Sequence, residues 1–159
     1  MKGYTFQGYK KENMARVQGT ALPISTKQSV EICNFIKNKN VAKAKQLLLG
    51  VIDKKVAVPF NRYNWDLGHK TGIGPGRYPE KASEHFIQMI ESVEANAQFK
   101  GLNTSNLVIV HASAHLAGKS WHYGRKSRRK MKRTNLEIVV EEKKAVEKVI
   151  KPKKEVKNK

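Results

Sequence analysis

Apolar positions follow a helical pattern in three stretches between residues 25 and 101, and a strand-like pattern between residues 107 and 142. Three stretches carry apolar residues at the i, i+3, i+4 spacing of one helix face. The first begins at Ser25 and ends near Asn38, the second begins at Asn40, and the third runs from Pro79 to Gly101. We therefore expect three amphipathic helices. The buried stripe of the third is predicted to consist of Ala82, Phe86, Met89, Ile90, Val93 and Ala97.

The residues that flank these stretches fit helix ends. Ser25, followed three residues later by Gln28, has the pattern of a capping box. Asn40 is suited to cap the second helix, and Gly101 is a good stop for the third.

Two β-rich apolar runs lie between residues 107 and 142 and flank a polar segment, which indicates an antiparallel hairpin. Paired from end to end, each arm would hold roughly 15 residues and reach on the order of 50 Å. Only the bases of the arms are aliphatic, so the tip is expected to lie against something other than the protein's own core. In the second arm Leu136 and Ile138 alternate with Glu137, which predicts one buried face and one partly wet face.

The chain carries 32 Lys and Arg residues against 13 acidic ones, a formal net charge of +19. This balance indicates a polyanionic partner. The hairpin tip concentrates the charge, since residues 118–133 contain eight basic residues and no acidic one. The candidate RNA-binding residues of the tip are Lys119, Trp121, His122, Tyr123, Arg125, Lys126, Arg128, Arg129, Lys130, Lys132 and Arg133. Guanidinium groups suit phosphates, and aromatic rings suit unpaired bases, so nucleic acid is the first hypothesis and a solvated basic loop the second.

The stretch from residue 58 to residue 79 shows no periodicity and is expected to be a long irregular loop held by Pro and aromatic residues. It offers Arg62, His69, Lys70 and Arg77 to RNA phosphates. Its glycines do not form a phosphate loop, because no Gly-Lys-Ser/Thr ending is present.

Catalysis is not expected. His111 and His115 share a strand face, but a metal site would need a third ligand of the right type, so we interpret both as polar contacts to the partner. Nuclease chemistry lacks clustered carboxylates, and hydrolase chemistry lacks a nucleophile elbow. We expect no cofactor and no metal. The single cysteine, Cys33, excludes an intrachain disulfide. With no apolar run long enough for a membrane span and no signal peptide, the sequence indicates the cytoplasm.

Several motifs, taken together in order, resemble one family. They are Ala21-Leu22-Pro23-Ile24-Ser25, the start of the second helix at Val41-Ala42, Val58-Pro59-Phe60-Asn61-Arg62-Tyr63-Asn64, Gly76-Arg77-Tyr78-Pro79, Glu94-Ala95-Asn96-Ala97 with Gly101-Leu102, Ile109-Val110-His111-Ala112 and the strand from Arg133 to Val140. This set is similar to the universal large-subunit ribosomal protein L-twenty-two family in its archaeal form, whose eukaryotic counterpart is large-subunit protein L-seventeen. The likeness extends to about Glu142.

The resemblance implies an α+β fold, with three helices packed on a small antiparallel sheet and a long protruding β-hairpin. It implies one domain over residues 1–142, with the hairpin arm at about 107–140 and the tip at about 119–132. The expected partners are large-subunit rRNA, neighbouring ribosomal proteins and the nascent peptide, with the protein a monomer in the ribosome and the tip lining the exit tunnel. Residues 143–159 form a Lys-rich tail that is expected to be mostly disordered. The conformation of residues 1–20 stays open between a short strand and an extended arm.

Two other functions remain as alternatives. A free-standing regulator would bind DNA or RNA through a β-ribbon arm. An RNA hydrolase is the more distant alternative.

Overall fold

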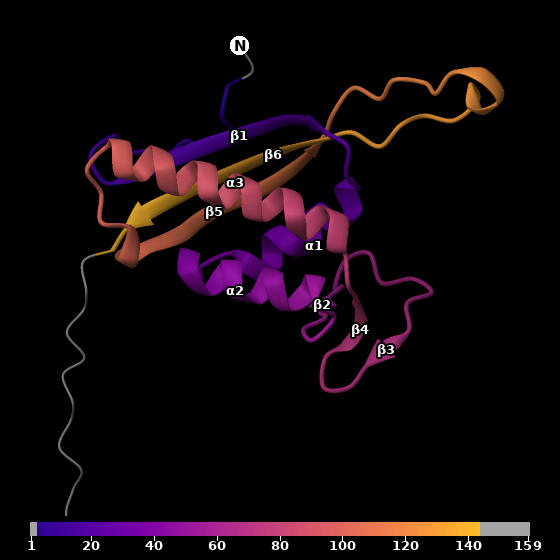
Figure 1. Ribbon diagram of the computed structural model, residues 1–159, viewed down its shortest axis with the longest axis horizontal. Helices are drawn as coiled ribbons and strands as arrows, with labels where there is room; N and C mark the ends of the chain where they lie inside the picture. Colours follow the sequence, from indigo (N-terminus) through magenta and orange to yellow (C-terminus); the bar gives the residue numbers. More distant parts are fainter. Residues whose placement is uncertain (1–2, 144–159) are drawn as a thin grey trace, which may run out of the picture.

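The computed structural model describes residues 3–143, and it confirms an α+β fold built on two layers (Figure 1). One layer is an antiparallel sheet in the order β1-β6-β5, formed by β1 (Met14–Leu22), β6 (Thr134–Glu142) and β5 (Leu107–Leu116). The other layer holds α1 (Thr26–Ile36), α2 (Val41–Ile52) and α3 (Glu80–Phe99). Helix α3 packs on β1, α1 packs on β5, and α2 packs on α3.

The core lies between the two layers, and it uses the stripes that the sequence predicts. All six residues expected in the stripe of α3, from Ala82 to Ala97, are buried. From the sheet, Ile109, Leu136 and Ile138 face them as part of the same apolar cluster. Burial of these side chains contributes the main favourable term to folding.

The helix ends follow the sequence at two positions and depart from it at a third. Asn40 caps α2, because its side-chain oxygen accepts the backbone N–H of Ala42 at 2.9 Å. Gly101 follows α3 with a φ of 74°, a left-handed conformation that glycine adopts without strain. The prediction of a capping box at Ser25 is wrong. Ser25 occupies the N-cap position of α1, but its side chain makes no capping hydrogen bond.

The hairpin of β5 and β6 is the longest element of the sheet, but its continuous ladder is shorter than predicted. The pairing runs from Leu107 opposite Glu142 to Leu116 opposite Thr134, with a bulge between Ile109 and His111. The expectation of about 15 paired residues in each arm is therefore wrong for the regular ladder. Beyond the end of the ladder, the two segments of the hairpin continue side by side and project from the body (Figure 1).

Strand β1 settles part of what the sequence left open for residues 1–20. It pairs antiparallel with β6, from Met14 opposite Glu141 to Leu22 opposite Thr134. Because β5 covers one edge of β6 and β1 the other, β6 is the central strand. Ala21 and Leu22 belong to β1.

The stretch 58–79 contains more structure than the sequence predicts. Strands β2 (Val58–Pro59), β4 (Gly74–Arg77) and β3 (His69–Lys70) form a second small antiparallel sheet in the order β2-β4-β3. The prediction of a wholly irregular loop is therefore wrong. This unit lies beside α1, on the side of the helices away from the main sheet (Figure 1).

The outer face of the main sheet is covered by residues 3–10, which we name the N-terminal strap. The backbone N–H groups of Thr5 and Phe6 donate hydrogen bonds to the carboxylate of Glu137, at 2.9 and 3.1 Å respectively. Glu137 is only 2% exposed. The expected partly wet face of β6 is therefore buried at this position. Within residues 3–143, no helix has the length and apolar character that crossing a membrane requires.

Candidate nucleic-acid interface

We name residues 117–133 the hairpin tip. The two sides of the tip are joined by separate backbone hydrogen bonds, from Ala117 N to Arg133 O (3.1 Å), from Met131 N to Ser120 O (2.8 Å) and from His122 N to Arg129 O (2.9 Å). A short 3-10 turn, Gly124–Lys126, closes the end, and Gly124 takes a φ of 62° there. The tip is thus a narrow arm of two paired segments, closed by a turn.

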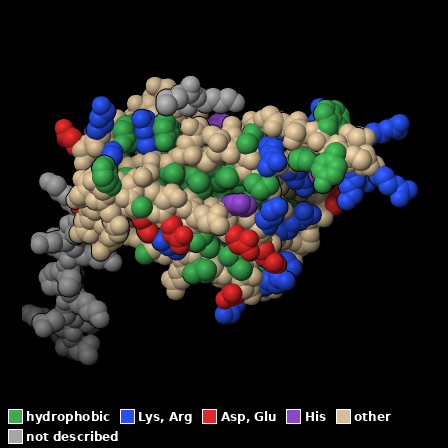
Figure 2. Space-filling model, turned by 45° about the horizontal axis from the view of Figure 1, so that its top comes forward, with side chains coloured by type: hydrophobic (Ala, Val, Ile, Leu, Met, Phe, Trp, Pro, Cys, Tyr) green, Lys and Arg blue, Asp and Glu red, His purple; other side chains and the backbone are tan. Residues whose placement is uncertain are grey.

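The basic side chains of the tip have no acidic partner within residues 3–143. Seven of its eight cations are exposed, namely Lys119, Arg125, Lys126, Arg128, Arg129, Lys130 and Lys132. None of them forms an ion pair with an acidic group of residues 3–143. Figure 2 shows Lys and Arg side chains gathered at the end of the molecule that the tip forms. Because like charges at this density repel each other, the surface favours a polyanion.

Arg133 differs from the other seven. Its Nη1 donates to the carbonyl oxygen of Ala21 at 3.3 Å, while the N–H of Ala21 donates to Oδ1 of Asn135 at 2.8 Å. Ala21 has a φ of 52° and lies in the irregularity between Gly19 and Leu22 of β1, where the register with β6 shifts. The backbone of a non-glycine residue in this region is strained, so Arg133 and Asn135 together fix the base of the tip.

Aromatic side chains stand among the cations of the tip. Tyr123 is 89% exposed at the outer end, and Trp121 is 57% exposed with the Lys130 ammonium 4.6 Å from its ring centroid. His122 is half-buried. The exposed rings offer stacking faces to unpaired bases.

The two strand histidines have different surroundings. His115 is exposed, and its Nε2 lies 3.2 Å from the hydroxyl of Ser113. The ring of His111 lies against Phe6, with centroids 5.1 Å apart, and its Nε2 is 4.0 Å from Oε1 of Glu137. Burial lowers the pKa of His111 below its ordinary value, and the nearby Glu137 carboxylate opposes this shift. His111 therefore faces the strap, and we leave it out of the interface proposed below.

A second basic surface lies on the 58–79 unit. The four residues that the sequence predicts there, Arg62, His69, Lys70 and Arg77, are all exposed. The turn that carries Arg62 is fixed from below by Glu31, which is 1% exposed. Its carboxylate accepts the backbone N–H groups of Asn61 (3.3 Å), Arg62 (2.9 Å) and Tyr63 (2.9 Å).

Three residues that the structure makes prominent are absent from the predicted site residues. Glu31 and Glu137 each organise a segment distant in the chain, and Trp65 is 87% exposed on the 58–79 unit. An acid between apolar Val30 and Ile32 was the available signal for Glu31. Among residues 3–143, no group of three or more His, Cys, Asp or Glu side chains is placed to hold a metal ion.

Comparison with known proteins identifies the class to which this body and basic hairpin belong. Residues 17–141 match the family model described as Ribosomal protein L22p/L17e, so the chain belongs to this family of ribosomal proteins. It is a family of structural proteins and not of enzymes. The free-standing regulator and the hydrolase are accordingly set aside.

The relatives come from archaea, in agreement with the archaeal type of the sequence motifs. "Large ribosomal subunit protein uL22" of Methanoculleus marisnigri is 42% identical over 140 residues, which cover 82% of this chain and 91% of the relative. The protein of the same name from Thermoplasma acidophilum is 41% identical, over 89% of this chain and 96% of the relative. That of Nanoarchaeum equitans is 43% identical, over 84% and 81%.

Proposed function

We propose that this protein is a structural constituent of the large ribosomal subunit in the cytoplasm, that it binds large-subunit rRNA, and that its hairpin tip extends to the wall of the nascent-peptide exit tunnel. The observation that carries the rRNA proposal is the hairpin tip, with seven exposed cations and no acidic partner within residues 3–143. An isolated arm of this charge is stabilised when phosphates neutralise it.

The body supports this role by fixing the base of the arm. The regular ladder ends at Leu116 and Thr134, and Thr134 is fully buried, with its hydroxyl 2.9 Å from the carbonyl oxygen of Ile24. The arm therefore leaves the body in a defined direction. A basic arm held in this way reaches between RNA segments that the body does not contact, and neutralises their phosphates.

Salt dependence of binding tests the role of the tip in recognising RNA. The full chain is titrated against transcribed large-subunit rRNA at several salt concentrations, beside the variant Arg128→Gln/Arg129→Gln. Removing two phosphate contacts is expected to lower the slope of log K against log salt by about 1.4 to 1.8. The matched control is Lys11→Gln/Lys43→Gln, which removes the same charge from exposed positions of the body. Equal slopes for both variants would exclude a dominant role for the tip.

Sedimentation of a native lysate tests residence in the subunit. One copy per large subunit after a high-salt wash is expected, and a position at the top of the gradient would contradict the proposal.

The tunnel position is tested by cross-linking. Burial raises the pKa of the Cys33 thiol to about 12, so this native cysteine is unreactive at neutral pH. A cysteine introduced by Tyr123→Cys is then the reactive thiol among residues 3–143. Ribosomes that carry it are stalled with a nascent chain bearing a thiol-reactive group. Cross-links at position 123, absent from a Lys11→Cys control, are expected, and their absence at every chain length would refute tunnel lining.

A further inference from the structure

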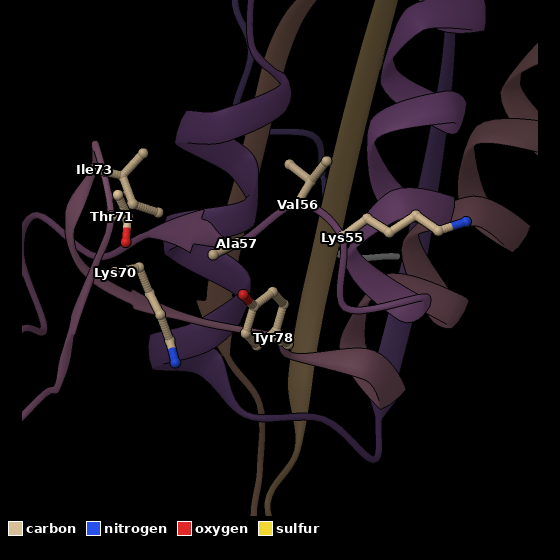
Figure 3. A pocket seen from close by; sticks show the side chains of 7 residues that line it. All are labelled: Lys55, Val56, Ala57, Lys70, Thr71, Ile73 and Tyr78. Carbon is tan, nitrogen blue, oxygen red and sulfur yellow. The ribbon is translucent and has the colours of Figure 1, made fainter.

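The 58–79 unit contains a hollow that the basic hairpin does not explain. Its volume is about 380 Å³, within the range of small-ligand sites. Val56 and Ala57, which follow α2, form one wall, and Thr71 and Ile73, from the β3–β4 turn, form the other. Tyr78 and Lys70 complete the lining (Figure 3). We name this hollow the Tyr78 pocket.

The pocket combines an aromatic ring with a cation that has no acidic partner in the described part of the chain. The Lys70 ammonium lies 5.4 Å from the centroid of the Tyr78 ring and has no ion pair with a carboxylate of residues 3–143. Lys55, also at the rim, is directed away from the hollow and pairs with Asp53 at 3.1 Å (Figure 3). Lys70 is therefore the cation available to a ligand in the pocket.

The pocket also offers two hydroxyl groups to a ligand. The hydroxyl of Tyr78 is directed toward Ala57, and neither it nor the hydroxyl of Thr71 has a hydrogen-bond partner in the described part of the chain (Figure 3). Each hydroxyl can donate one hydrogen bond and accept others. Apolar walls, a ring face and two free hydroxyls suit a flat heterocycle with polar edges.

The surroundings favour a nucleotide that is part of a longer strand. A second hollow of about 520 Å³ shares Lys70 and Tyr78 and continues past Arg77 and the glycines Gly68 and Gly76. Arg77 is exposed and without an acidic partner among residues 3–143. At Gly72 and Gly74 of the adjoining turn an added side-chain carbon would meet nothing within 4 Å, so a strand has room to approach the backbone.

We propose that the Tyr78 pocket receives one unpaired base of large-subunit rRNA. The base stacks on Tyr78, and the neighbouring phosphates contact Lys70 and Arg77. This proposal rests on the proposed function, since it names a second site for the same RNA. It adds a base-recognising pocket at a place separate from the hairpin tip.

Cross-linking of native large subunits at 254 nm tests the pocket directly. After trypsin digestion, an RNA adduct is expected on the peptide Tyr78-Pro79-Glu80-Lys81. Chemical probing adds a second readout: a single nucleotide of the rRNA is expected to be protected by the wild-type chain and reactive with the variant Tyr78→Leu. An adduct that joins this peptide to a neighbouring protein, or a probing pattern unchanged by the variant, would overturn the proposal.

Affinity measurements separate stacking from charge. Tyr78→Leu is expected to weaken rRNA binding by roughly five-fold or more, with an unchanged salt slope, because it removes a ring and no charge. Lys70→Gln is expected to lower the slope by about 0.7 to 0.9. Tyr78→Phe retains the ring and removes only the hydroxyl, so it should weaken binding less than Tyr78→Leu does. If the wild-type chain binds rRNA and the variants bind with the same affinity and salt slope, the pocket alone is refuted. If the wild-type chain does not bind rRNA, the proposed function is refuted.

Discussion

The carboxylate of Glu137 accepts two hydrogen bonds from Thr5, at 2.9 Å from the backbone N–H and 2.7 Å from the hydroxyl. The two residues are 132 positions apart, and their contact attaches the N-terminal strap to the central strand of the sheet. Tyr4 and Tyr9 of the strap extend this attachment, since the Arg16 guanidinium lies 4.0 and 4.2 Å from the centroids of their rings. The strap is thus held by one buried acid and one cation between two rings.

Replacing Glu137 is therefore expected to release the strap. Glu137→Ala leaves the donors of Thr5 and Phe6 without their charged acceptor and should lower the free energy of unfolding by about 1.5 to 3 kcal/mol. Denaturant unfolding measures this loss, and limited trypsin digestion at Lys10 and Lys11 should become faster. Glu91→Ala, at an exposed position of α3, is the control. Equal stability of the two variants would contradict the role given to Glu137.

Acid should lower the free energy of unfolding in two steps. Burial raises the pKa of Glu137, but the hydrogen bonds from Thr5 and Phe6 outweigh it, so the net pKa lies below its ordinary value of 4.5. Burial also keeps the pKa of His111 below 6.5. A lowered histidine pKa means that the unfolded state binds the proton first, so stability falls as the pH drops below about 6.5. The contribution of Glu137 is lost below about pH 4.5.

The first step can be isolated with His111→Gln. This variant should lose less stability than the wild type between pH 7.5 and pH 5.5, because the group that takes up the proton is gone. Urea unfolding at the two pH values measures the difference, and His85→Gln on α3 is the control. A wild-type loss that persists in full in His111→Gln would assign the effect to another group.

Glu31 is expected to position the turn that presents Arg62. Glu31→Gln keeps one acceptor oxygen but removes the charge and the second acceptor from three backbone donors. Hydrogen exchange at the amides of Asn61, Arg62 and Tyr63 should become at least ten-fold faster, which corresponds to about 1.4 kcal/mol. Asn34→Ala, at an exposed position of the same helix, should leave these amides unchanged. Protection that survives in Glu31→Gln would show that other contacts hold the turn.

The two helix caps predicted from the sequence should respond differently to alanine. Asn40→Ala removes the bond to the N–H of Ala42 and a second bond to the carbonyl of Ser105, each 2.9 Å long. It should cost about 1 kcal/mol or more. Ser25→Ala removes no capping bond and should change stability by less than about 0.5 kcal/mol. Thermal unfolding of both variants decides whether the predicted capping box has any energetic weight.

Local periodicity explains how much of the fold was predictable. Helices α1, α2 and α3 and the hairpin of β5 and β6 were expected because neighbouring residues set their apolar faces. The exposure of the basic tip was predictable for the same reason, since no apolar side chain between Lys126 and Lys130 draws it inward. The family was recognisable from the order of short motifs, and the comparisons confirm it.

The features that the sequence did not determine depend on contacts between distant segments. Strand β1 has weak periodicity and is a strand because β6 offers it a free edge. The 58–79 unit is ordered by a carboxylate from α1, 30 residues or more away, and the Tyr78 pocket exists only where that unit meets the end of α2. The chain by itself determined its helices, its hairpin and its charge, because these follow from residues close in sequence. Only the tertiary structure decided which acids are buried, which cations stay free and where an aromatic ring lies beside a lysine, because each depends on what distant segments bring to the same place.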